Sequence, residues 1–180
     1  MPKYYYGSID WNQQPVTLIA SEIGLAALEF KRLVDMDLRR FAEKPMEDSG
    51  RMAPYLKQVE AYFEGKQHQF DLPLDFQGTD FQKRIWRFLI TIPYGKVASY
   101  QQAAQAAGNE KAVRAAGMAN NKNPISVVIP CHRVVGKDGS LTGYGGGLHI
   151  KEALLKHEGI QVDGGRIREA SAWLKTPASR

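Results

Sequence analysis

The chain has a single cysteine, Cys131, among its 180 residues. One cysteine cannot form a disulfide within the chain, and it excludes a zinc site built from several cysteines. The fold must therefore be held by burial of apolar side chains, which a hydrophobic content of 43% allows. The N-terminus lacks the apolar stretch of a signal peptide, and no segment has the ~20 apolar residues that span a bilayer. We expect a soluble, cytoplasmic protein in a reducing compartment.

Charge is distributed unevenly along the chain. Residues 1–78 carry 9 basic and 12 acidic side chains, whereas residues 79–180 carry 15 basic and 7 acidic ones. A net charge of +5 is compatible with an anionic partner but does not require one. Any nucleic acid should bind to the second part of the chain.

The first 76 residues are predicted to form a small α/β or α+β domain with no catalytic signature. Apolar residues recur at helical spacing over Pro54–Gly65, and Gly65 offers a stop signal. Strands are expected over Tyr4–Asp10, Pro15–Ala20, Leu25–Phe30 and Gln67–Leu72.

A second domain is expected over residues 77–160, after a boundary at Leu72–Gly78. Thr79 and Gln82 have the spacing of a capping box, which predicts a helix over about 80–92. Ser99 and Gln102 form a second box of the same type and predict a short alanine-rich helix to about residue 107.

A tight turn at Gly108-Asn109 separates this short helix from the next one, which is expected over Glu110–Asn121 with Asn109 as its cap. Small residues in both helices allow them to approach closely. Two short helices joined by a turn are typical of a helix-turn-helix. Alanine-rich helix pairs also occur in packed domains that bind no DNA, so this outline leaves both interpretations open.

The cysteine lies between two apolar segments. Val127–Ile129 is predicted to be a buried strand and Val134-Val135 its return. A cysteine in such surroundings often behaves as a small buried hydrophobe. However, His132 follows it directly, and a neighbouring imidazole favours the thiolate. Because adjacent side chains on a strand face opposite ways, a Cys131–His132 interaction would need a turn or a bridging water.

Two further segments follow the cysteine. The loop Gly143–Gly147 lacks the sequence context of a phosphate-binding loop, and it is expected to form a flexible wall that presents Tyr144 and bare backbone N–H groups. A helix is expected from about Ile150 to Glu158, where a carboxylate could orient an imidazole. Residues 161–180 are expected to be a tail with one short helix around Ala170–Leu174.

These motifs resemble those of the 6-O-alkylguanine-DNA alkyltransferases, the methylated-DNA–protein-cysteine methyltransferases. The resemblance is specific over residues 79–159 and only architectural over 1–78. It implies an α/β (α+β) fold, with a ribonuclease-H-like sheet and helix domain before a mostly helical domain that has a helix-turn-helix and a short active-site hairpin. The segments that carry it are Thr79–Ile85, Ile92–Gly95, Ser99–Ala103, Asn123–Gly136, Gly143–Gly147 and Lys151–Gly159.

The resemblance implies direct-reversal DNA repair. An alkyl group would pass irreversibly from 6-O-alkylguanine, and also from 4-O-methylthymine, to Cys131, which would not be regenerated. His132 would act as a base through a water, and Glu158 would orient it. Tyr100 would donate a proton to guanine N3, and Asn123 would brace the turn that leads to the site.

The resemblance also implies a double-stranded DNA partner containing alkylated guanine, with no membrane, metal or cofactor. Arg114 would insert into the duplex and fill the space of the extruded nucleotide. The protein would be a monomer that could bind DNA cooperatively. Gly145 departs from the family, which often has Ser or Ala there. The resemblance implies that the other DNA-binding and base-binding residues would be Tyr144, Gly145, Val134, Ser99 and Arg133.

Three other classes of protein share some of these features. Lesion-binding relatives without chemistry replace the nucleophile, so the presence of Cys131 argues against them. A helix-turn-helix regulator would not need an intact Cys/His/Glu set. A cysteine hydrolase would turn over and would need an oxyanion hole, for which the sequence gives no sign. Only the alkyltransferase would form a stoichiometric adduct on Cys131.

Overall fold

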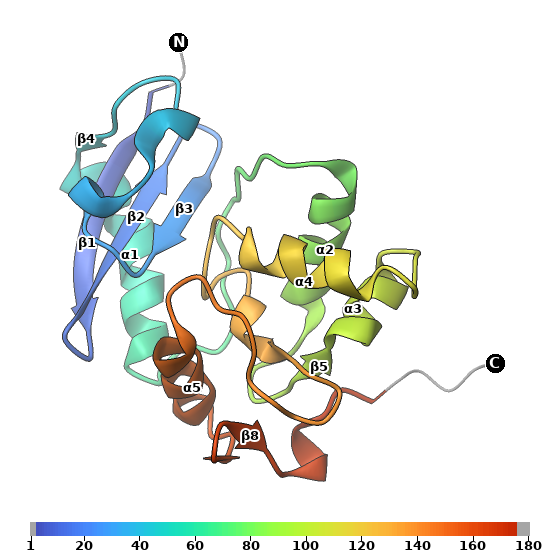
Figure 1. The fold of residues 1–180 in the computed structure, drawn as a ribbon. Coiled ribbons are helices and arrows are strands. Elements are labelled where there is room, and N and C mark those ends of the chain that lie inside the picture. Colours follow the sequence, from blue (N-terminus) through green and yellow to red (C-terminus); the bar gives the residue numbers. More distant parts are fainter. Residues whose placement is uncertain (1–2, 176–180) are drawn as a thin grey trace. The chain divides into compact units, whose positions relative to one another are not determined.

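The structure is a computed structural model, and it describes residues 3–175. Its backbone forms two compact units, coloured by sequence in Figure 1. Unit 1 contains the chain up to Gln77 together with Pro124–Val128. Unit 2 contains Gly78–Asn123 and the chain from Ile129 onward.

Unit 1 is a four-stranded sheet with one long helix. The strand order is β3-β2-β1-β4, with antiparallel pairs except for the parallel β1–β4 pair. Helix α1 packs against β1 and β2. The mixed sheet and helix confirm the expected α/β character of this part of the chain. The bounds are β1 Tyr5–Trp11, β2 Gln14–Ala20, β3 Leu25–Glu29, β4 Met46–Glu47 and α1 Ser49–Phe63.

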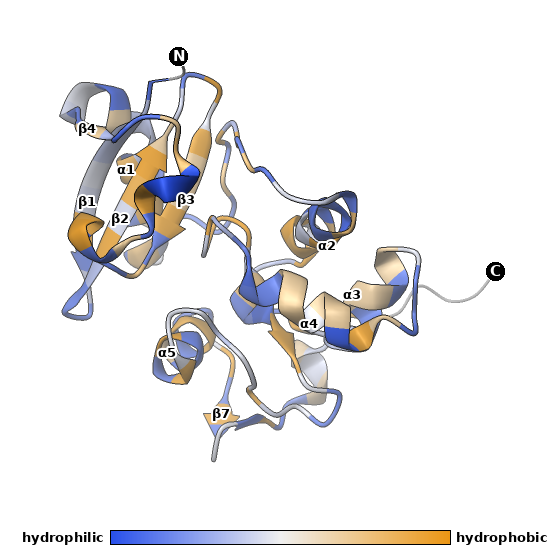
Figure 2. Ribbon diagram, turned by 45° about the horizontal axis from the view of Figure 1, so that its top comes forward, coloured by the Kyte–Doolittle hydropathy of each residue, from blue (hydrophilic) through white to orange (hydrophobic). Residues whose placement is uncertain are grey.

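Apolar side chains hold this sheet in place. Figure 2 shows apolar residues concentrated along β2 and β3, and most residues of both strands are buried. Two 3-10 turns, Leu33–Asp35 and Leu38–Arg40, lie between β3 and β4. Met36 between them packs on Ile19 and Ala27.

The strand predicted over Gln67–Leu72 is wrong. No residue of this segment pairs with a strand, and the nearest bridge joins Leu74, beyond its end, to Leu25. The Gln58 side chain instead binds both the N–H and the C=O of Asp71, at 2.9 Å each. Those backbone groups are therefore satisfied by a side chain rather than by a neighbouring strand.

The strand predicted over Val127–Ile129 is also wrong. Val127 has a φ of +72°, which is incompatible with extended backbone and uncommon for a β-branched residue. The segment Pro124–Val128 pairs with Leu28 at a single bridge, through Leu28 N–H to Pro124 O and Ser126 N–H to Leu28 O. The chain therefore bends here instead of forming one arm of a hairpin.

Unit 2 is mostly helical, as expected. Both predicted capping boxes are present, with Thr79 on α2 and Ser99 on α3. Helix α4 begins three residues later than the expected Glu110, because Asn109 Oδ1 accepts from the Lys111 N–H in a turn rather than capping a helix. The bounds are α2 Asp80–Thr91, α3 Tyr100–Ala106, α4 Val113–Asn121 and α5 Leu148–His157.

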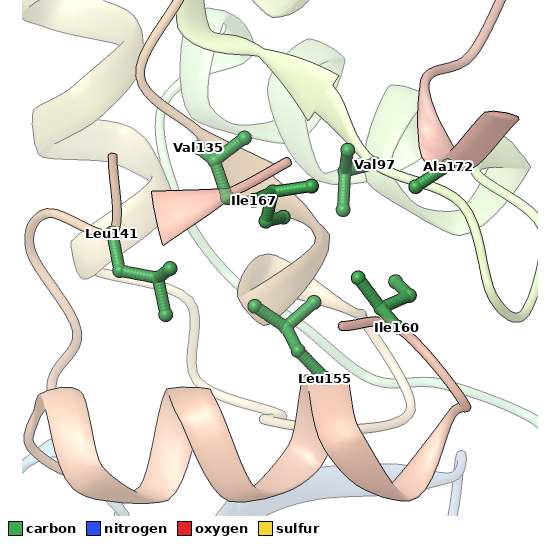
Figure 3. Packing of buried hydrophobic residues seen from close by; sticks show 7 residues of the cluster. All are labelled: Val97, Val135, Leu141, Leu155, Ile160, Ile167 and Ala172. Carbon is green, nitrogen blue, oxygen red and sulfur yellow. The ribbon is translucent and has the colours of Figure 1, made fainter. Parts of the chain in front are cut away.

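Short strands connect these helices. β5 (Ala98–Ser99) pairs in parallel with β6 (Val134–Val135), and β7 (Val162–Asp163) pairs with β8 (Arg166–Ile167). Residues 161–175, expected to be a tail, contain this hairpin and the 3-10 turn Ala170–Ala172, whereas residues 176–180 lie outside the described part. The side chains of Ile167 and Ala172 join a core with α5 (Figure 3). It consists of Val97, Val135, Leu141, Leu155, Ile160, Ile167 and Ala172.

None of the helices over residues 3–175 is long and apolar enough to cross a membrane.

Candidate active site

Cys131 begins a 3-10 turn, Cys131–Arg133, rather than a strand. Its N–H donates to Ile129 O at 2.8 Å, and the Arg133 N–H donates to Pro130 O at 3.0 Å. The turn removes the alternation of side chains that a strand would impose. The residue is 4% exposed, so the thiol lies in a nearly water-free environment.

A buried carboxylate organises the two residues that follow the cysteine. Glu158 Oε1 lies 2.7 Å from His132 Nε2 and 2.8 Å from Arg133 Nη2. Glu158 Oε2 accepts from Arg133 Nε at 2.9 Å and from the Gly95 N–H at 3.0 Å. The Glu158 side chain therefore joins the loop before β5, the 3-10 turn and the end of α5.

The protonation states follow from this geometry. Burial alone would raise the pKa of Glu158, but the attraction of His132 and Arg133 holds it well below its usual range. Burial lowers the pKa of His132, and Glu158 opposes that shift only in part. At neutral pH the site therefore contains an ionised Glu158 and a neutral His132.

An ionised carboxylate cannot donate, so His132 Nε2 carries the imidazole proton and Nδ1 is the acceptor of the ring. Nδ1 is buried and has no hydrogen-bond partner among the described residues. This tautomer is the one that lets a histidine accept a proton from a neighbouring thiol.

Tyr100, at the first position of α3, is half-buried and belongs to a second polar cluster, around the buried Lys151. Its hydroxyl donates to Thr142 O at 2.6 Å. Lys151 Nζ lies 3.4 Å from the same hydroxyl, 2.6 Å from Val134 O and 3.0 Å from Thr142 O. Burial raises the pKa of Tyr100, so its hydroxyl is protonated at neutral pH. Sequence reasoning gave Lys151 no role.

Two asparagines connect helix α4 to the cysteine segment. Asn123 Nδ2 donates to Ile129 O at 2.7 Å, which agrees with its expected bracing position. Asn120, a second residue to which sequence reasoning gave no role, is 2% exposed and donates from Nδ2 to Cys131 O at 3.3 Å. The sequence signal that could have identified it is its position four residues after Ala116, on the apolar face of α4.

Helix α4 presents Arg114 to solvent, as a DNA-inserting residue requires. The opposite side of the helix is buried through Ala116, Ala119 and Asn120. The Trp86 indole N–H donates to Ala119 O at 2.9 Å and fixes α4 to α2.

The remaining predicted binding residues occupy different environments. Gly145 is exposed and Tyr144 is half-buried in the loop before α5, whereas Val134 is buried in β6. Ser99 is 8% exposed and caps α3 through the Gln102 N–H. Arg133 is buried against Glu158 and also donates to Ile92 O, so it supports the site from within instead of lying at a DNA-facing surface.

The described residues contain no group of three or more His, Cys, Asp or Glu side chains arranged to hold a metal ion.

Comparison with known proteins identifies relatives of both units. Residues 80–160 match the family described as 6-O-methylguanine DNA methyltransferase, DNA binding domain. Residues 4–76 match the family described as 6-O-methylguanine DNA methyltransferase, ribonuclease-like domain. The methylated-DNA–protein-cysteine methyltransferase of Methanosarcina barkeri is 45% identical over 157 residues, which cover 86% of this chain and 96% of that protein.

Solved structures give the same result. The crystal structure of Mycobacterium tuberculosis O6-methylguanine methyltransferase has 42% sequence identity and a TM-score of 0.75, covering 86% of this chain and 92% of that one. The structure of Mycobacterium tuberculosis OGT in complex with DNA has 43% identity, a TM-score of 0.75 and the same coverage.

Proposed function

We propose that this chain, which belongs to the methylated-DNA–protein-cysteine methyltransferase family, uses Cys131 as the acceptor in direct-reversal repair of DNA. It removes an alkyl group from 6-O-alkylguanine in double-stranded DNA and retains that group as an S-alkyl cysteine. Each molecule reacts once.

The observation that carries the assignment of roles is the buried set of Cys131, His132 and Glu158. Glu158 holds His132 with Nδ1 as its acceptor, and His132 directly follows the one cysteine of the chain in sequence. A free thiol has a pKa of about 8.5, so a base that accepts its proton supplies the thiolate that attacks carbon. His132 would receive that proton through a water.

The transfer itself is a displacement at the alkyl carbon. The Cys131 sulfur forms a bond to that carbon as the bond to guanine O6 breaks, and the released electron pair passes to the guanine ring. Tyr100 would give its hydroxyl proton to guanine N3, which makes the leaving group neutral. This role agrees with the protonated state of the Tyr100 hydroxyl.

DNA binding is the function of the helix-turn-helix formed by α3 and α4. Arg114 would enter the duplex as the damaged nucleotide leaves it. Tyr144, Gly145, Val134 and Ser99 would line or adjoin the base pocket.

Several finer points extend the proposal. All proposed catalytic residues belong to unit 2 of one chain, so a monomer can carry out the reaction, and cooperative binding on DNA would affect only occupancy. A free thiol nucleophile persists in a reducing compartment such as the cytoplasm. The same displacement could act on 4-O-methylthymine. No step in this reaction requires a metal or a cofactor.

Mass spectrometry after mixing with duplex DNA containing 6-O-methylguanine tests the assignment. We expect one methyl group per protein, located on Cys131. Cys131→Ser should bind the lesion but take up no methyl group, because a hydroxyl is far harder to ionise than a thiol. Methylation of the Cys131→Ser protein, or catalytic turnover by the wild type, would contradict the proposal.

A further inference from the structure

The side-chain amide of Asn120 is a buried polar group that contacts the backbone of the nucleophile. Asn120 is 2% exposed on α4, and its Nδ2 donates to Cys131 O at 3.3 Å. Its Oδ1 is buried and has no hydrogen-bond partner among residues 3–175. An orphaned buried oxygen lowers stability, so a contribution to the fold does not explain this amide. Its effect on Cys131 O offers another explanation.

The carbonyl oxygen of Cys131 accepts two hydrogen bonds from the protein itself. The Val134 N–H donates to it at the end of the 3-10 turn, and Asn120 Nδ2 is the second donor. A carbonyl oxygen has two lone pairs. Cys131 O would therefore stay hydrogen-bonded without Asn120, whereas with Asn120 it has no lone pair left for a ligand. Val134 O, which adjoins the proposed base pocket, also accepts from the protein, through Lys151 Nζ at 2.6 Å.

The chemistry of the damaged bases shows what a free carbonyl would select. Enzymes that extrude a nucleotide read its base by hydrogen bonds to the Watson–Crick edge. On that edge 6-O-alkylguanine presents the alkylated oxygen, an acceptor nitrogen and a 2-amino group, which is its one donor. Alkylated 4-O-alkylthymine presents an oxygen acceptor where guanine has the amino group. Because the reacting oxygen belongs to the same edge, a base that meets the Cys131 sulfur brings this edge to the residue that carries Cys131 O.

We propose that Asn120 is a specificity-determining residue, which occupies Cys131 O and so removes the acceptor that would select the 2-amino group. The inference rests on the proposed function and names its substrate class, which is alkylated bases with or without that amino group. A site that hydrogen-bonds a substrate N–H rejects the analogue that lacks it, because a buried polar group is then left unpaired. Asn120 keeps Cys131 O paired whichever base is bound, so loss of the amino group carries little penalty.

A lesion that lacks only the 2-amino group tests this role. Such a base is 6-O-methylhypoxanthine, placed in the same duplex sequence as 6-O-methylguanine. Asn120→Leu replaces the amide by an apolar side chain of similar size and leaves Cys131 O with an open lone pair. Its ratio of single-turnover rates, guanine lesion to hypoxanthine lesion, should exceed the wild-type ratio by on the order of tenfold, as expected for an unsatisfied buried acceptor. The ratio of 6-O-methylguanine to 4-O-methylthymine transfer should rise with it.

Gln105→Leu is the matched control, because it exchanges an exposed amide on α3 for the same apolar side chain. Both of its rate ratios should equal those of the wild type. Differences in the extrusion of the lesions cancel, since each variant is compared with the wild type on the same pair of duplexes. A merely structural role of Asn120 would slow both transfers equally. An unchanged ratio in Asn120→Leu, or an equal rise in Gln105→Leu, would overturn the proposal.

The wild-type protein provides a test that needs no variant to fold. The free bases 6-O-methylguanine and 6-O-methylhypoxanthine require no extrusion, and their intrinsic reactivities are measured with a small thiolate in solution. After this correction, their rates of transfer to Cys131 should agree within about tenfold. A larger loss on removal of the amino group would overturn the role of Asn120 and leave the proposed function intact. Failure of duplex 6-O-methylguanine to form any adduct on Cys131 would instead refute the proposed function itself.

Discussion

Glu158 Oε1 lies 2.7 Å from His132 Nε2 while the same carboxylate accepts two hydrogen bonds from Arg133 Nε. The two residues after the cysteine are thus held by one buried anion. Arg133 compensates the charge that orients His132, because a lone buried carboxylate would otherwise tend to take up a proton. In the proposed mechanism, the ion pair keeps Glu158 ionised and His132 in one tautomer.

Glu158→Gln should lower stability and slow alkyl transfer together. The amide keeps the volume but leaves the buried Arg133 without a counter-charge, a change that typically costs about 3–5 kcal/mol. Urea denaturation measures this loss of stability. Glu152→Gln breaks an exposed pair on the same helix and should cost less than about 1 kcal/mol. Equal costs for the two variants would contradict a stabilising role of the buried pair.

The same pair predicts how stability depends on pH. The folded-state pKa of Glu158 lies below its ordinary value of 4.5, so the unfolded chain binds the proton more readily. The contribution of Glu158 is fully present above that value and is lost as the pH falls below it. Denaturation curves between pH 3 and pH 7, chosen to span this range, should therefore show a weaker acid dependence in Glu158→Gln than in the wild type.

Arg114→Ala should impair repair of duplex DNA more than reaction with the free alkylguanine base. The free base needs no extrusion from a duplex, so it does not need an inserted side chain. Single-turnover rates with both substrates give the comparison. Arg87→Ala, which removes an exposed arginine from α2, should leave the ratio of the two rates unchanged. If Arg114→Ala lowered both rates equally, the inserting role would be wrong.

Local signals predicted the parts of the fold that depend on local chemistry. The boxes Thr79/Gln82 and Ser99/Gln102 located the starts of α2 and α3 because a cap is formed by residues three positions apart. The strand over Val127–Ile129 failed for the opposite reason. The positive φ of Val127 opposes its own preference for extended backbone, and nothing in the surrounding sequence indicates such a bend.

The candidate site also contains relationships that local sequence signals could not predict. His132 and Glu158 are 26 positions apart, so their partnership came from the family resemblance and not from spacing. The buried position of Lys151 depends on carbonyls at Val134 and Thr142, which belong to other elements. One local signal was available, since Lys151 lies one helical turn before the buried Leu155, on the apolar face of α5.

Ser99 has two assigned roles that one pair of variants can separate. Ser99→Ala and Thr79→Ala each remove a capping hydroxyl from a complete capping box, so each should lower stability by about 1 kcal/mol. Only Ser99→Ala should also weaken binding to duplex DNA, because Thr79 has no proposed contact with it. Equal DNA affinities of the two variants would leave Ser99 with the capping role alone.

Ile167→Ala tests whether the chain after residue 160 is a structural part of unit 2. Ile167 is 4% exposed and packs in the core with Leu155 of α5 (Figure 3). Removing a buried isoleucine side chain leaves a cavity and typically costs about 2–5 kcal/mol. The matched control is Ile90→Ala on α2, where the side chain is 44% exposed and the cost should stay near about 0.5 kcal/mol.

Chemical denaturation of both variants provides this comparison. Val97 N–H donates to Ala172 O and Leu174 N–H donates to Val97 O, so the segment is also tied by backbone bonds to the chain just before β5. A loss of packing at Ile167 should therefore be transmitted to β5 and to Ser99 at its end, and alkyl transfer should slow as well. If Ile167→Ala cost no more than Ile90→Ala, the segment would contribute little to the core and would act as the tail that its sequence indicated.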